Sequence, residues 1–280
     1  MNAAEILEVE DVAFIEPSFS ALTDPVYTDL LATGEWDEGR LLLDEHEEPV
    51  GVAFHEPGGW IAGSFLCRPP SVSLIDRFEE VNGEIFQDDR AVWAAAVREY
   101  FSGKLLCGVS PAIEDLNLTR HDILTEVIAD TWGRGNGEPC IDCCCGSGVG
   151  SLVLREQGYT PLSYDNDPAL LARGLAVHRL LPEETMCLDA TIASAYLDRV
   201  PLGIGVMMGE INTFSQEMWQ QIAAEFFAVA GEVLITVGTG TEAQIVKSWG
   251  EAAGRLVEIR ENTSDPFYDH WICIAHLEPE

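Results

Sequence analysis

Residues 139–152, PCIDCCCGSGVGSL, decide the fold of the second half of the chain. The segment begins as a short apolar strand, PCIDCC, and passes directly into a helical pattern, VGSLVLREQG. Gly146, Gly148 and Gly150 therefore fall at the turn between strand and helix. Glycine has no Cβ, so the chain can turn tightly there and a ligand can touch the backbone. A turn of this kind lies at the carboxyl edge of a doubly wound sheet, where ligands bind.

Strand and helix patterns alternate after this turn. The segments TPLSYD, TMCLDA, LGIGVMMGE and EVLITVGT are typical of buried strands, and amphipathic helical patterns separate them. RLVEIRE and HWICIAHLE follow, with only a polar turn between them. For residues 111–280 the sequence therefore predicts an α/β fold: a doubly wound, mostly parallel seven-stranded sheet with a C-terminal antiparallel hairpin.

Helix ends are also marked in the sequence. Thr119 and Asp122 form a Thr-x-x-Asp capping signature at the start of the helix before the glycine-rich turn. Asp167 precedes Pro168 and is expected to cap the helix after TPLSYD. A third helix, SQEMWQQIAAEFFAVA, places Trp219, Phe226 and Phe227 at helical spacing, which predicts core positions.

Residues 1–110 follow another pattern. Short apolar runs are broken by HEPGG, which indicates a hairpin or meander, and the helix DDRAVWAAAVREYFSG is expected to end at Gly103. We expect a smaller N-terminal α+β region that acts as a cap or substrate region, because it matches no motif and an added element beside a cofactor domain usually carries specificity.

Charge and hydropathy limit the partners. The chain has 48 acidic and 15 basic residues, a formal net charge of -33. Such a field repels phosphate backbones and anionic lipid, so we expect no nucleic-acid partner and no membrane partner. No N-terminal signal pattern is visible and the apolar runs are too short to span a bilayer, which predicts a cytoplasmic protein.

The turn resembles the first motif of the class I, Rossmann-like S-adenosylmethionine-dependent methyltransferases. That motif runs Asp-x-Gly-x-Gly-x-Gly, and this chain has Asp142, Cys144, Gly146 and Gly148 in those places. Cysteine thus replaces the first glycine. DCCCGSG is also similar to the Asp-Pro-x-Cys-Gly-Ser-Gly variant of amino-methylating members. The resemblance covers roughly residues 119–277 and implies S-adenosylmethionine as the cofactor.

The resemblance also implies the residues that bind this cofactor. Asp165, 19 residues after Gly146, matches the acid that accepts both ribose hydroxyls, and Asp189 matches the residue that holds the adenine amino group. LTRHDIL is similar to a Thr-Pro-x-x-Ile segment without its proline, which makes Thr119 a candidate contact for the methionine carboxylate. The predicted cofactor-binding set is Thr119, Asp142, Cys144, Gly146, Ser147, Gly148, Asp165, Asn166, Asp189 and Ala190.

The same turn is compatible with two other kinds of site, a nicotinamide site and a metal or redox site. A nicotinamide enzyme would use the same strand, turn and acid, but it usually spaces its glycines as Gly-x-Gly-x-x-Gly. A metal or redox site would use Cys140, Cys143, Cys144 and Cys145, yet only one Cys-x-x-Cys pair is present and successive strand residues point to opposite faces. We therefore predict no metal and interpret the run as a cofactor loop.

The segment after the fourth predicted strand bears on the class of methyl acceptor. Nucleic-acid and protein amide methylating members carry Asn/Asp-Pro-Pro-Tyr/Phe after the fourth strand, whereas this chain has MMGEINTF. Glu210, predicted to end that strand, is the candidate catalytic base or substrate anchor. These observations favour a methyltransferase that acts on a small molecule or a protein. The alternative is a module that binds the cofactor as a sensor or scaffold without transferring a methyl group.

Overall fold

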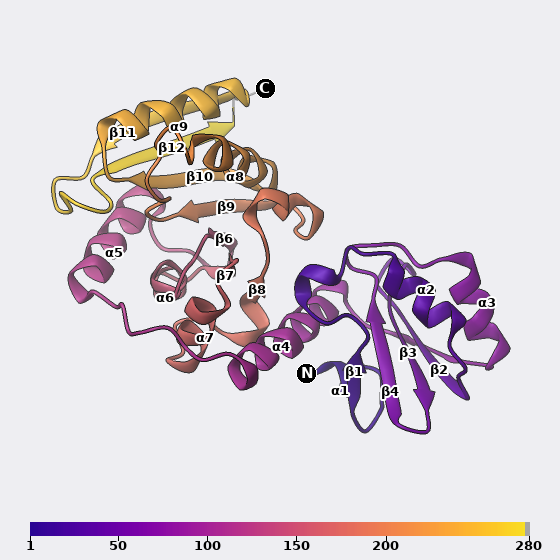
Figure 1. Ribbon diagram of the computed structural model, residues 1–280. Helices are drawn as coiled ribbons and strands as arrows, with labels where there is room; N and C mark the ends of the chain where they lie inside the picture. Colours follow the sequence, from indigo (N-terminus) through magenta and orange to yellow (C-terminus); the bar gives the residue numbers. More distant parts are fainter. Residues whose placement is uncertain (278–280) are drawn as a thin grey trace. The chain divides into compact units, whose positions relative to one another are not determined.

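The computed structural model describes residues 1–277 and divides into two compact units, Met1–Lys104 and a second unit that begins at Leu105 (Figure 1). The predicted second domain runs to residue 280 and its last predicted strand to Glu278, so both end outside the described residues. Within residues 1–277 no helix is long and apolar enough to cross a membrane.

The first unit is built on a five-stranded sheet of order β1-β4-β3-β2-β5. Strands β2, β3 and β4 pair antiparallel, while β1 and β5 join the two edges in parallel. The strands are β1 (Val12–Phe14), β2 (Glu38–Leu43), β3 (Pro49–Glu56), β4 (Gly59–Ser64) and β5 (Glu84–Gln87). The helices are α1 (Ala3–Ile6), η1 (Phe19–Ala21), α2 (Val26–Thr33), α3 (Val72–Glu80) and α4 (Arg90–Gly108).

Apolar side chains cover both faces of this sheet. Leu31 of α2 and Phe78 of α3 pack with Phe54 of β3 in one buried cluster. On the other side of β3, a Cβ added to Gly51 would lie 2.5 Å from the ring of Trp93 in α4. The prediction that this helix ends at Gly103 is wrong, because α4 continues to Gly108. One interior glycine costs a helix only about 1 kcal/mol, too little to stop it.

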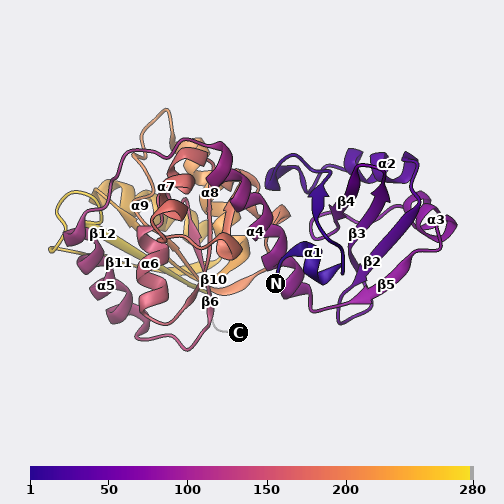
Figure 2. The same cartoon turned by 90° about the horizontal axis from the view of Figure 1, so that it is seen from below.

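The second unit contains a seven-stranded sheet of order β11-β12-β10-β9-β6-β7-β8. Neighbouring strands of this sheet pair in parallel, except that β12 is antiparallel to both β10 and β11. This arrangement confirms the predicted doubly wound sheet and its terminal hairpin (Figures 1 and 2). The strands are β6 (Pro139–Cys143), β7 (Thr160–Asp165), β8 (Thr185–Cys187), β9 (Val200–Gly205), β10 (Ala230–Val237), β11 (Arg255–Glu261) and β12 (Trp271–Leu277).

Helices cover both faces of this second sheet. α5 and α6 share one buried cluster with β6, β9 and β10 through Leu124, Val153, Cys140, Ile204 and Leu234. On the opposite face, a Cβ on Gly203 of β9 would lie 2.5 Å from Phe226 of α8. The helices are α5 (Leu118–Trp132), α6 (Val149–Glu156), α7 (Pro168–Ala176), α8 (Gln216–Val229) and α9 (Gly240–Ala252), with η2 (Pro182–Glu184) and η3 (Ala190–Ala195) as short 3₁₀ turns.

The predicted helix caps had different outcomes. Asp167 accepts hydrogen bonds from the N–H groups of Ala169 and Leu170 at 2.8 and 3.2 Å, which confirms it as the cap of α7. The capping role of Thr119 is wrong. Asn117 caps α5 instead, because its Oδ1 accepts from the N–H groups of residues 119 and 120 at 3.0 and 3.4 Å.

The fourth strand of the second unit also ends earlier than predicted. β9 stops at Gly205, so Glu210 lies five residues beyond it, in a loop. Met207 adopts a left-handed backbone with φ 53°. Its N–H donates to Oγ1 of Thr236 at 2.7 Å instead of continuing the ladder. The chain therefore leaves the sheet before the acid that was expected to end the strand.

Candidate functional site

The turn after β6 is an alternating left-handed backbone. Cys144, Gly146 and Gly148 have φ values of 56°, 54° and 85°. The N–H of Cys145 donates to the carbonyl of Tyr164 at 3.0 Å, and the N–H of Gly148 donates to the carbonyl of Cys145 at 2.9 Å. A left-handed residue other than glycine costs roughly 1–2 kcal/mol. Cys144 thus holds, at some cost, the conformation that the missing first glycine of the motif would adopt freely.

Gly146 provides the open face of this turn. A Cβ added there would meet no atom within 4 Å, whereas one added to Gly148 would lie 2.6 Å from the side chain of Leu180. The backbone at Gly146 is thus accessible to a ligand, while Gly148 is glycine because the chain packs closely beneath it. Gly148 is also the first, left-handed residue that leads into α6.

Asp142 lies beneath the turn and is completely buried. Its Oδ2 accepts a hydrogen bond from Oγ of Ser151 at 2.6 Å, and its Oδ1 has no hydrogen-bond partner. Burial raises the pKa of this carboxyl from 3.8 to about 7. A Cβ on Gly150 would lie 2.8 Å from Oδ2 and 3.0 Å from Oδ1 of Asp142. The third glycine of the segment is therefore required by the close approach of helix α6 to this acid.

Asp165 ends β7 beside the turn. Its Oδ2 accepts from the N–H of Gly146 at 2.9 Å, and its Oδ1 accepts from the N–H of Asp167 at 2.8 Å. Partial burial raises the pKa of this carboxyl, although the two backbone N–H groups oppose that effect. The carboxylate is therefore fixed at the carboxyl edge of the sheet, next to the accessible backbone of Gly146.

A cavity of about 360 Å³ lies over these groups, within the range of small-molecule sites. Four of the predicted cofactor residues line it: Cys144, Gly146, Ser147 and Asp165. Its other lining residues are Asp115, Asn117, Arg120, Leu124, Cys145, Val149, Gly150, Leu170, Val206, Met207, Gly209 and Trp219. The structure thus brings the turn and the acid of the second strand together in one hollow.

The other predicted cofactor residues do not line this cavity: Thr119, Asp142, Gly148, Asn166, Asp189 and Ala190. Thr119, Asn166 and Asp189 are exposed, and Ala190 is buried. Asp189 caps η3, where its Oδ1 accepts from the N–H and the hydroxyl of Thr191 at 2.9 and 2.8 Å.

A segment before α5 contributes lining residues that the sequence did not reveal. Oγ of Ser147 donates to Oδ1 of Asp115 at 2.6 Å. Arg179, which is buried, donates to Glu114 at 2.7 Å, to Asp115 at 3.2 Å and to the carbonyl of Ser147 at 2.9 Å. The Arg179 guanidinium lowers the pKa of Glu114 to about 2. We call residues 111–117 the strap, since these bonds hold it against the turn.

Arg120 follows the strap on the first turn of α5 and also lines the cavity. Its Nε donates to Oδ2 of Asp269 at 2.7 Å, and Asp269 is buried. Oγ1 of Thr236 donates to the other oxygen of Asp269 at 2.5 Å. In the sequence Arg120 lies more than 100 positions before Thr236 and Asp269, so only the sheet topology brings it to them.

Glu210 and Asn212 do not line the cavity. Both are exposed; the carbonyl of Glu210 accepts from Oγ of Ser215 at 2.5 Å, and Asn212 accepts from the N–H groups of the same turn. Trp219, expected in the core, lines the cavity and is half-buried. Phe226 and Phe227 are buried, as predicted.

The cysteine run offers no metal site in the part of the chain that the structure describes, where no group of three or more His, Cys, Asp or Glu could hold an ion. The thiols of Cys143 and Cys144 lie 3.9 Å apart. Cys140, Cys143 and Cys145 are buried, and both Cys144 and Cys145 line the cavity. Cys140 and Cys143 therefore serve as small buried residues away from it.

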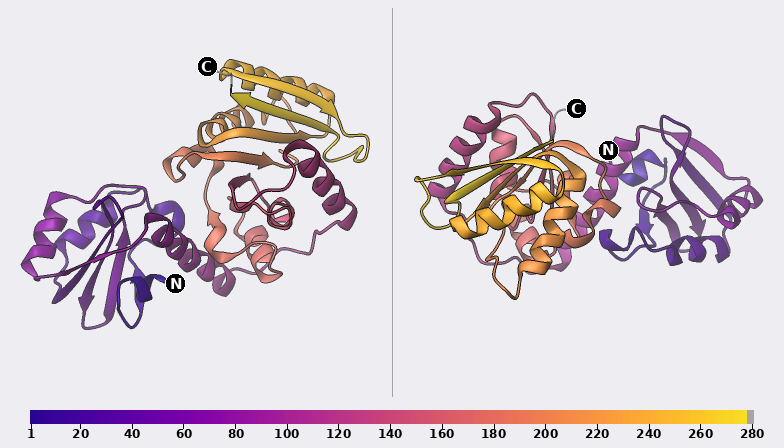
Figure 3. Two further views of the ribbon diagram at one scale, coloured as in Figure 1. Left: turned by 180° about the vertical axis from the view of Figure 1, so that it is seen from behind. Right: turned by 90° about the horizontal axis from the view of Figure 1, so that it is seen from above.

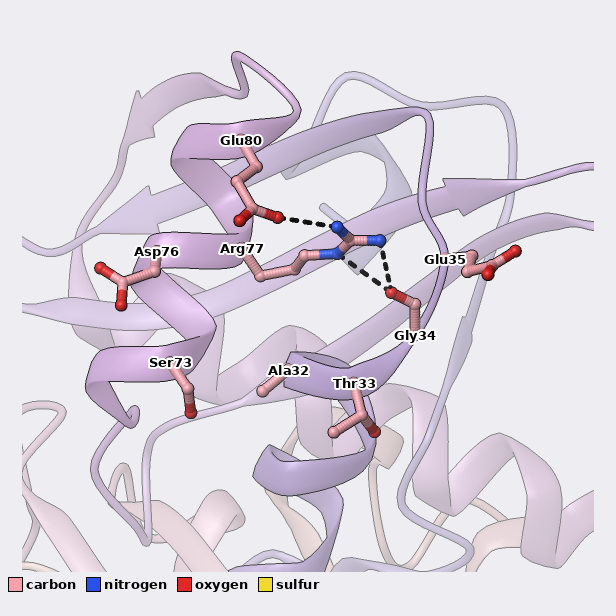
Figure 4. A pocket seen from close by; sticks show the side chains of 8 residues that line it. All are labelled: Ala32, Thr33, Gly34, Glu35, Ser73, Asp76, Arg77 and Glu80. Carbon is pink, nitrogen blue, oxygen red and sulfur yellow. Dashed lines mark hydrogen bonds and ion pairs between the residues drawn. The ribbon is translucent and has the colours of Figure 1, made fainter.

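The first unit has a separate surface hollow of about 480 Å³ between α2 and α3 (Figure 4). Arg77 lies across it, donating from Nε and Nη2 to the carbonyl of Gly34 at 3.0 and 2.7 Å and from Nη1 to Glu80 at 2.8 Å. Glu35 and Asp76 also line it. The guanidinium of Arg77 is thus already engaged by Gly34 and Glu80.

No protein-family model and no curated protein sequence matches the chain. Solved structures similar to it include a TehB-like S-adenosylmethionine-dependent methyltransferase from Corynebacterium glutamicum. The two sequences are 17% identical, the match covers 66% of this chain and 98% of that one, and the TM-score is 0.45. Magnesium protoporphyrin IX methyltransferase from Synechocystis has 12% identity, coverage of 65% and 96%, and a TM-score of 0.46. A proposed RNA methyltransferase from Pyrococcus horikoshii has 11% identity, coverage of 64% and 94%, and a TM-score of 0.42.

Proposed function

We propose that the chain is a methyltransferase that uses S-adenosylmethionine. The observation that carries this proposal is the pairing of the left-handed turn at 144–148 with Asp165, whose carboxylate is fixed to the N–H of Gly146 at 2.9 Å. An open backbone on one side and an acid on the next strand are what a ribose and its attached chain require at the carboxyl edge of such a sheet.

The lining residues fit this cofactor. Asp165 has carboxylate oxygens for the ribose hydroxyls, and the open face of Gly146 leaves room for the ligand against the backbone. Asp115 and Arg120 supply one negative and one positive group at the α5 side of the cavity, where an amino acid moiety with both charges would find partners. Arg120 therefore replaces Thr119 in our assignment of the carboxylate contact.

Asn166, Asp189 and Asp142 are also proposed to act on the cofactor, and this part of the proposal rests on the resemblance to the methyltransferase family. Asn166 and Asp189 follow β7 and β8 at the carboxyl edge of the sheet, and both are exposed, with Oδ1 of Asp189 engaged as the cap of η3. Asp142 would act from below, through the turn it supports, because it is buried and does not line the cavity.

Catalysis in this site is proposed to rest on positioning and on the exclusion of water. When bound, the cofactor would supply a methyl group attached to a positively charged sulfur. The acceptor's lone pair would bond the methyl carbon while the carbon–sulfur bond breaks and leaves its electron pair on sulfur. The acceptor's proton would go to solvent. The half-buried indole of Trp219 and the side chain of Leu124 cover apolar parts of the cavity. Glu210 has no supporting observation as a base, since its side chain is exposed outside the cavity.

The acceptor is proposed to be a small molecule or a protein side chain and not a nucleic acid. The net charge of -33 supports this. So do the arginines around the site, since Arg120 is paired with Asp269, Arg173 donates to the carbonyl of Ala112 at 2.6 Å, and Arg179 is held by the strap. We also propose that residues 1–110 help to select the acceptor. A cytoplasmic location is also proposed, because four of the eight cysteines crowd between residues 140 and 145, where adjacent cysteines make a poor disulfide framework.

A second candidate is a module that binds the cofactor without methyl transfer. The exposure of Glu210 and Asn212 favours it, because neither offers a polar group to an acceptor inside the cavity. Incubation with S-adenosylmethionine and a panel of acceptors separates the two candidates, since only the enzyme would form S-adenosylhomocysteine.

Calorimetric titration with S-adenosylmethionine and S-adenosylhomocysteine tests binding directly. Asp165→Ala should weaken binding by roughly one to two orders of magnitude, because hydrogen bonds to a charged acceptor contribute ~1.5–3 kcal/mol. The control is Asp167→Ala, which removes a helix cap and should lower the free energy of unfolding by ~1 kcal/mol with little effect on affinity. Absence of binding to the unsubstituted protein would exclude both candidates.

A further inference from the structure

Exposed apolar side chains gather at the carboxyl edge of the sheet in the second unit. Phe214, Phe267 and Ile113 are 98%, 78% and 89% exposed. Phe214 follows β9, and Phe267 lies in the loop between β11 and β12, which projects from the sheet in both views of Figure 3. The large exposed apolar residues at this edge are Ile113, Leu118, Ile192, Met207, Phe214, Met218, Phe267 and Tyr268. Those described elsewhere in the unit are Leu106, Val177, Leu256 and Leu277.

The strap and α5 belong to the same edge. α5 runs back toward the start of β6, so its first residue, Leu118, lies where β6 ends. Arg120 on its first turn bonds Asp269 of the β11–β12 loop at 2.7 Å. The N–H of Ala112 in the strap donates to the carbonyl of Ala169, in the first turn of α7, at 2.9 Å. These bonds connect the strap, α5, α7 and the β11–β12 loop at the carboxyl edge of the sheet, where several of their apolar side chains are exposed.

The apolar edge continues into the cavity. Leu124, Leu170, Val206, Met207 and Trp219 line the hollow that also contains the glycine-rich turn. The indole of Trp219 is held close to the loop after β9, because a Cβ on Gly209 would lie 2.4 Å from its ring. We call the apolar residues of the loop after β9 and of the first turn of α8 the apolar rim: Met207, Phe214, Met218 and Trp219. Met207 and Trp219 line the cavity, and Phe214 and Met218 are exposed beside them in the chain.

The charges beside the rim favour an occupant without negative charge. Asp115 and Asp165 line the cavity, and Glu210 is exposed on the same loop as Phe214. Arg120 is engaged by the buried Asp269 and, in the proposed function, by the carboxylate of the cofactor, so it is not available to an anionic acceptor. Carboxylates close to a binding surface repel an anionic ligand, which weakens its binding and lowers its rate of encounter.

We propose that the methyl acceptor is an apolar small molecule that is neutral or cationic and that binds on the apolar rim next to the cofactor. This inference rests on the proposed function. Its nucleophile would be an uncharged lone pair on nitrogen, oxygen or sulfur attached to an apolar body. In the reaction the lone pair bonds the methyl carbon, the carbon–sulfur bond leaves its electrons on sulfur, and the proton passes to solvent.

Two fluorescent probes test this inference on the full chain saturated with S-adenosylhomocysteine. Nile red is apolar and uncharged, and 1-anilinonaphthalene-8-sulfonate is apolar and anionic. Nile red should bind saturably and more tightly than the sulfonate, and the difference should shrink as salt screens the carboxylates. Phe214→Ser should weaken Nile red binding about tenfold, since the side chain is exposed in the free protein and would be covered by the probe.

Leu256→Ser is the matched control. Leu256 is 50% exposed on β11, away from the carboxyl edge, so its loss should leave Nile red binding unchanged. Trp219→Ala is the second test variant, with S-adenosylhomocysteine affinity measured in parallel to show that its fold is retained. Equal affinity of the F214S, L256S and unsubstituted proteins for Nile red would overturn the inference while leaving the proposed function standing. Sulfonate binding as tight as Nile red at low salt would refute its charge requirement. Failure of S-adenosylhomocysteine to bind would instead remove the proposed function itself.

Discussion

The buried carboxyl of Asp142 should make the stability of the second unit depend on pH. Its pKa rises from 3.8 to about 7 because burial disfavours the charged form. Ser151 donates to Oδ2 from α6 and also bonds Ser163 of β7 at 2.7 Å, while Asp165 raises the pKa of Asp142 and Arg120 lowers it. A carboxyl whose pKa is higher in the folded state stabilises the fold at low pH, and that stabilisation is lost as the pH rises through the folded value.

The magnitude follows from the two pKa values. Between pH 5 and pH 8, ionisation of Asp142 should lower the free energy of unfolding by about 2.5 kcal/mol, out of roughly 4 kcal/mol over the whole range. Asp142→Asn removes this contribution. Its amide group occupies the site of the unpartnered Oδ1, which adds a cost that is the same at every pH. The free energies of unfolding of D142N and the parent protein are therefore subtracted at each pH, and the prediction concerns how this difference changes with pH.

Urea unfolding at pH 5, 6, 7 and 8 measures this difference. D142N should gain about 2.5 kcal/mol relative to the parent protein between the two ends of the range. Ser151→Ala provides a second variant. Because it removes a hydrogen-bond donor that lowers the pKa of Asp142, the loss of stability with pH should occur at higher pH in S151A than in the parent protein. A difference that stays constant from pH 5 to pH 8 would show that Asp142 is ionised throughout and would refute the reasoning.

Three further predictions concern the turn, the strap and the cap of α5. Gly150→Ala should destabilise the protein by ~1–3 kcal/mol in thermal unfolding, because its Cβ has no room, whereas Gly103→Ala, in open space within α4, should stabilise it by ~0.5–1 kcal/mol. Arg179→Gln removes the bonds that hold the strap against the turn, so proteolysis at residues 111–117 should be faster and cofactor binding in calorimetry weaker. Unchanged proteolysis would show that Arg179 does not hold the strap. Asn117→Ala should lower stability by ~1 kcal/mol in urea while Thr119→Ala has little effect; the reverse order would restore the sequence-based cap.

The fold could be predicted because its signals are local. Most strands of the second sheet contain a short apolar run followed by a turn residue, β11 being an alternating apolar and charged segment, and Asp167 with Pro168 marks one helix start. The error at β9 has the same origin. LGIGVMMGE continues the apolar pattern beyond Gly205, but the bond from the N–H of Met207 to Thr236 on a neighbouring strand turns the chain away. A side-chain bond between strands leaves no trace in local hydropathy.

The candidate site was only partly predictable for a related reason. Cys144, Gly146 and Asp165 lie within one strand-turn-helix-strand unit, whose spacing the sequence displays. Arg120 depends on Asp269, which lies 149 positions away, and the strap depends on Arg179, which lies 64 positions beyond Asp115. An acidic pair such as Glu114 and Asp115 looks like a solvated surface until the buried arginine opposite it is known.

The acidity of the site suits the charge change in the proposed reaction. A sulfonium cofactor is positive at sulfur, and its demethylated product is not. Asp165 lines the cavity, as does Asp115, which is paired with Arg179, while Arg120 is paired with Asp269. A unit charge about 4 Å from a carboxylate is stabilised by roughly 1 kcal/mol in water and by roughly 4 kcal/mol in a partly buried site. The same carboxylates that hold the positive cofactor therefore hold the product less strongly. They also favour an acceptor that brings no negative charge of its own, so the electrostatics of cofactor binding, product release and acceptor choice have one structural cause.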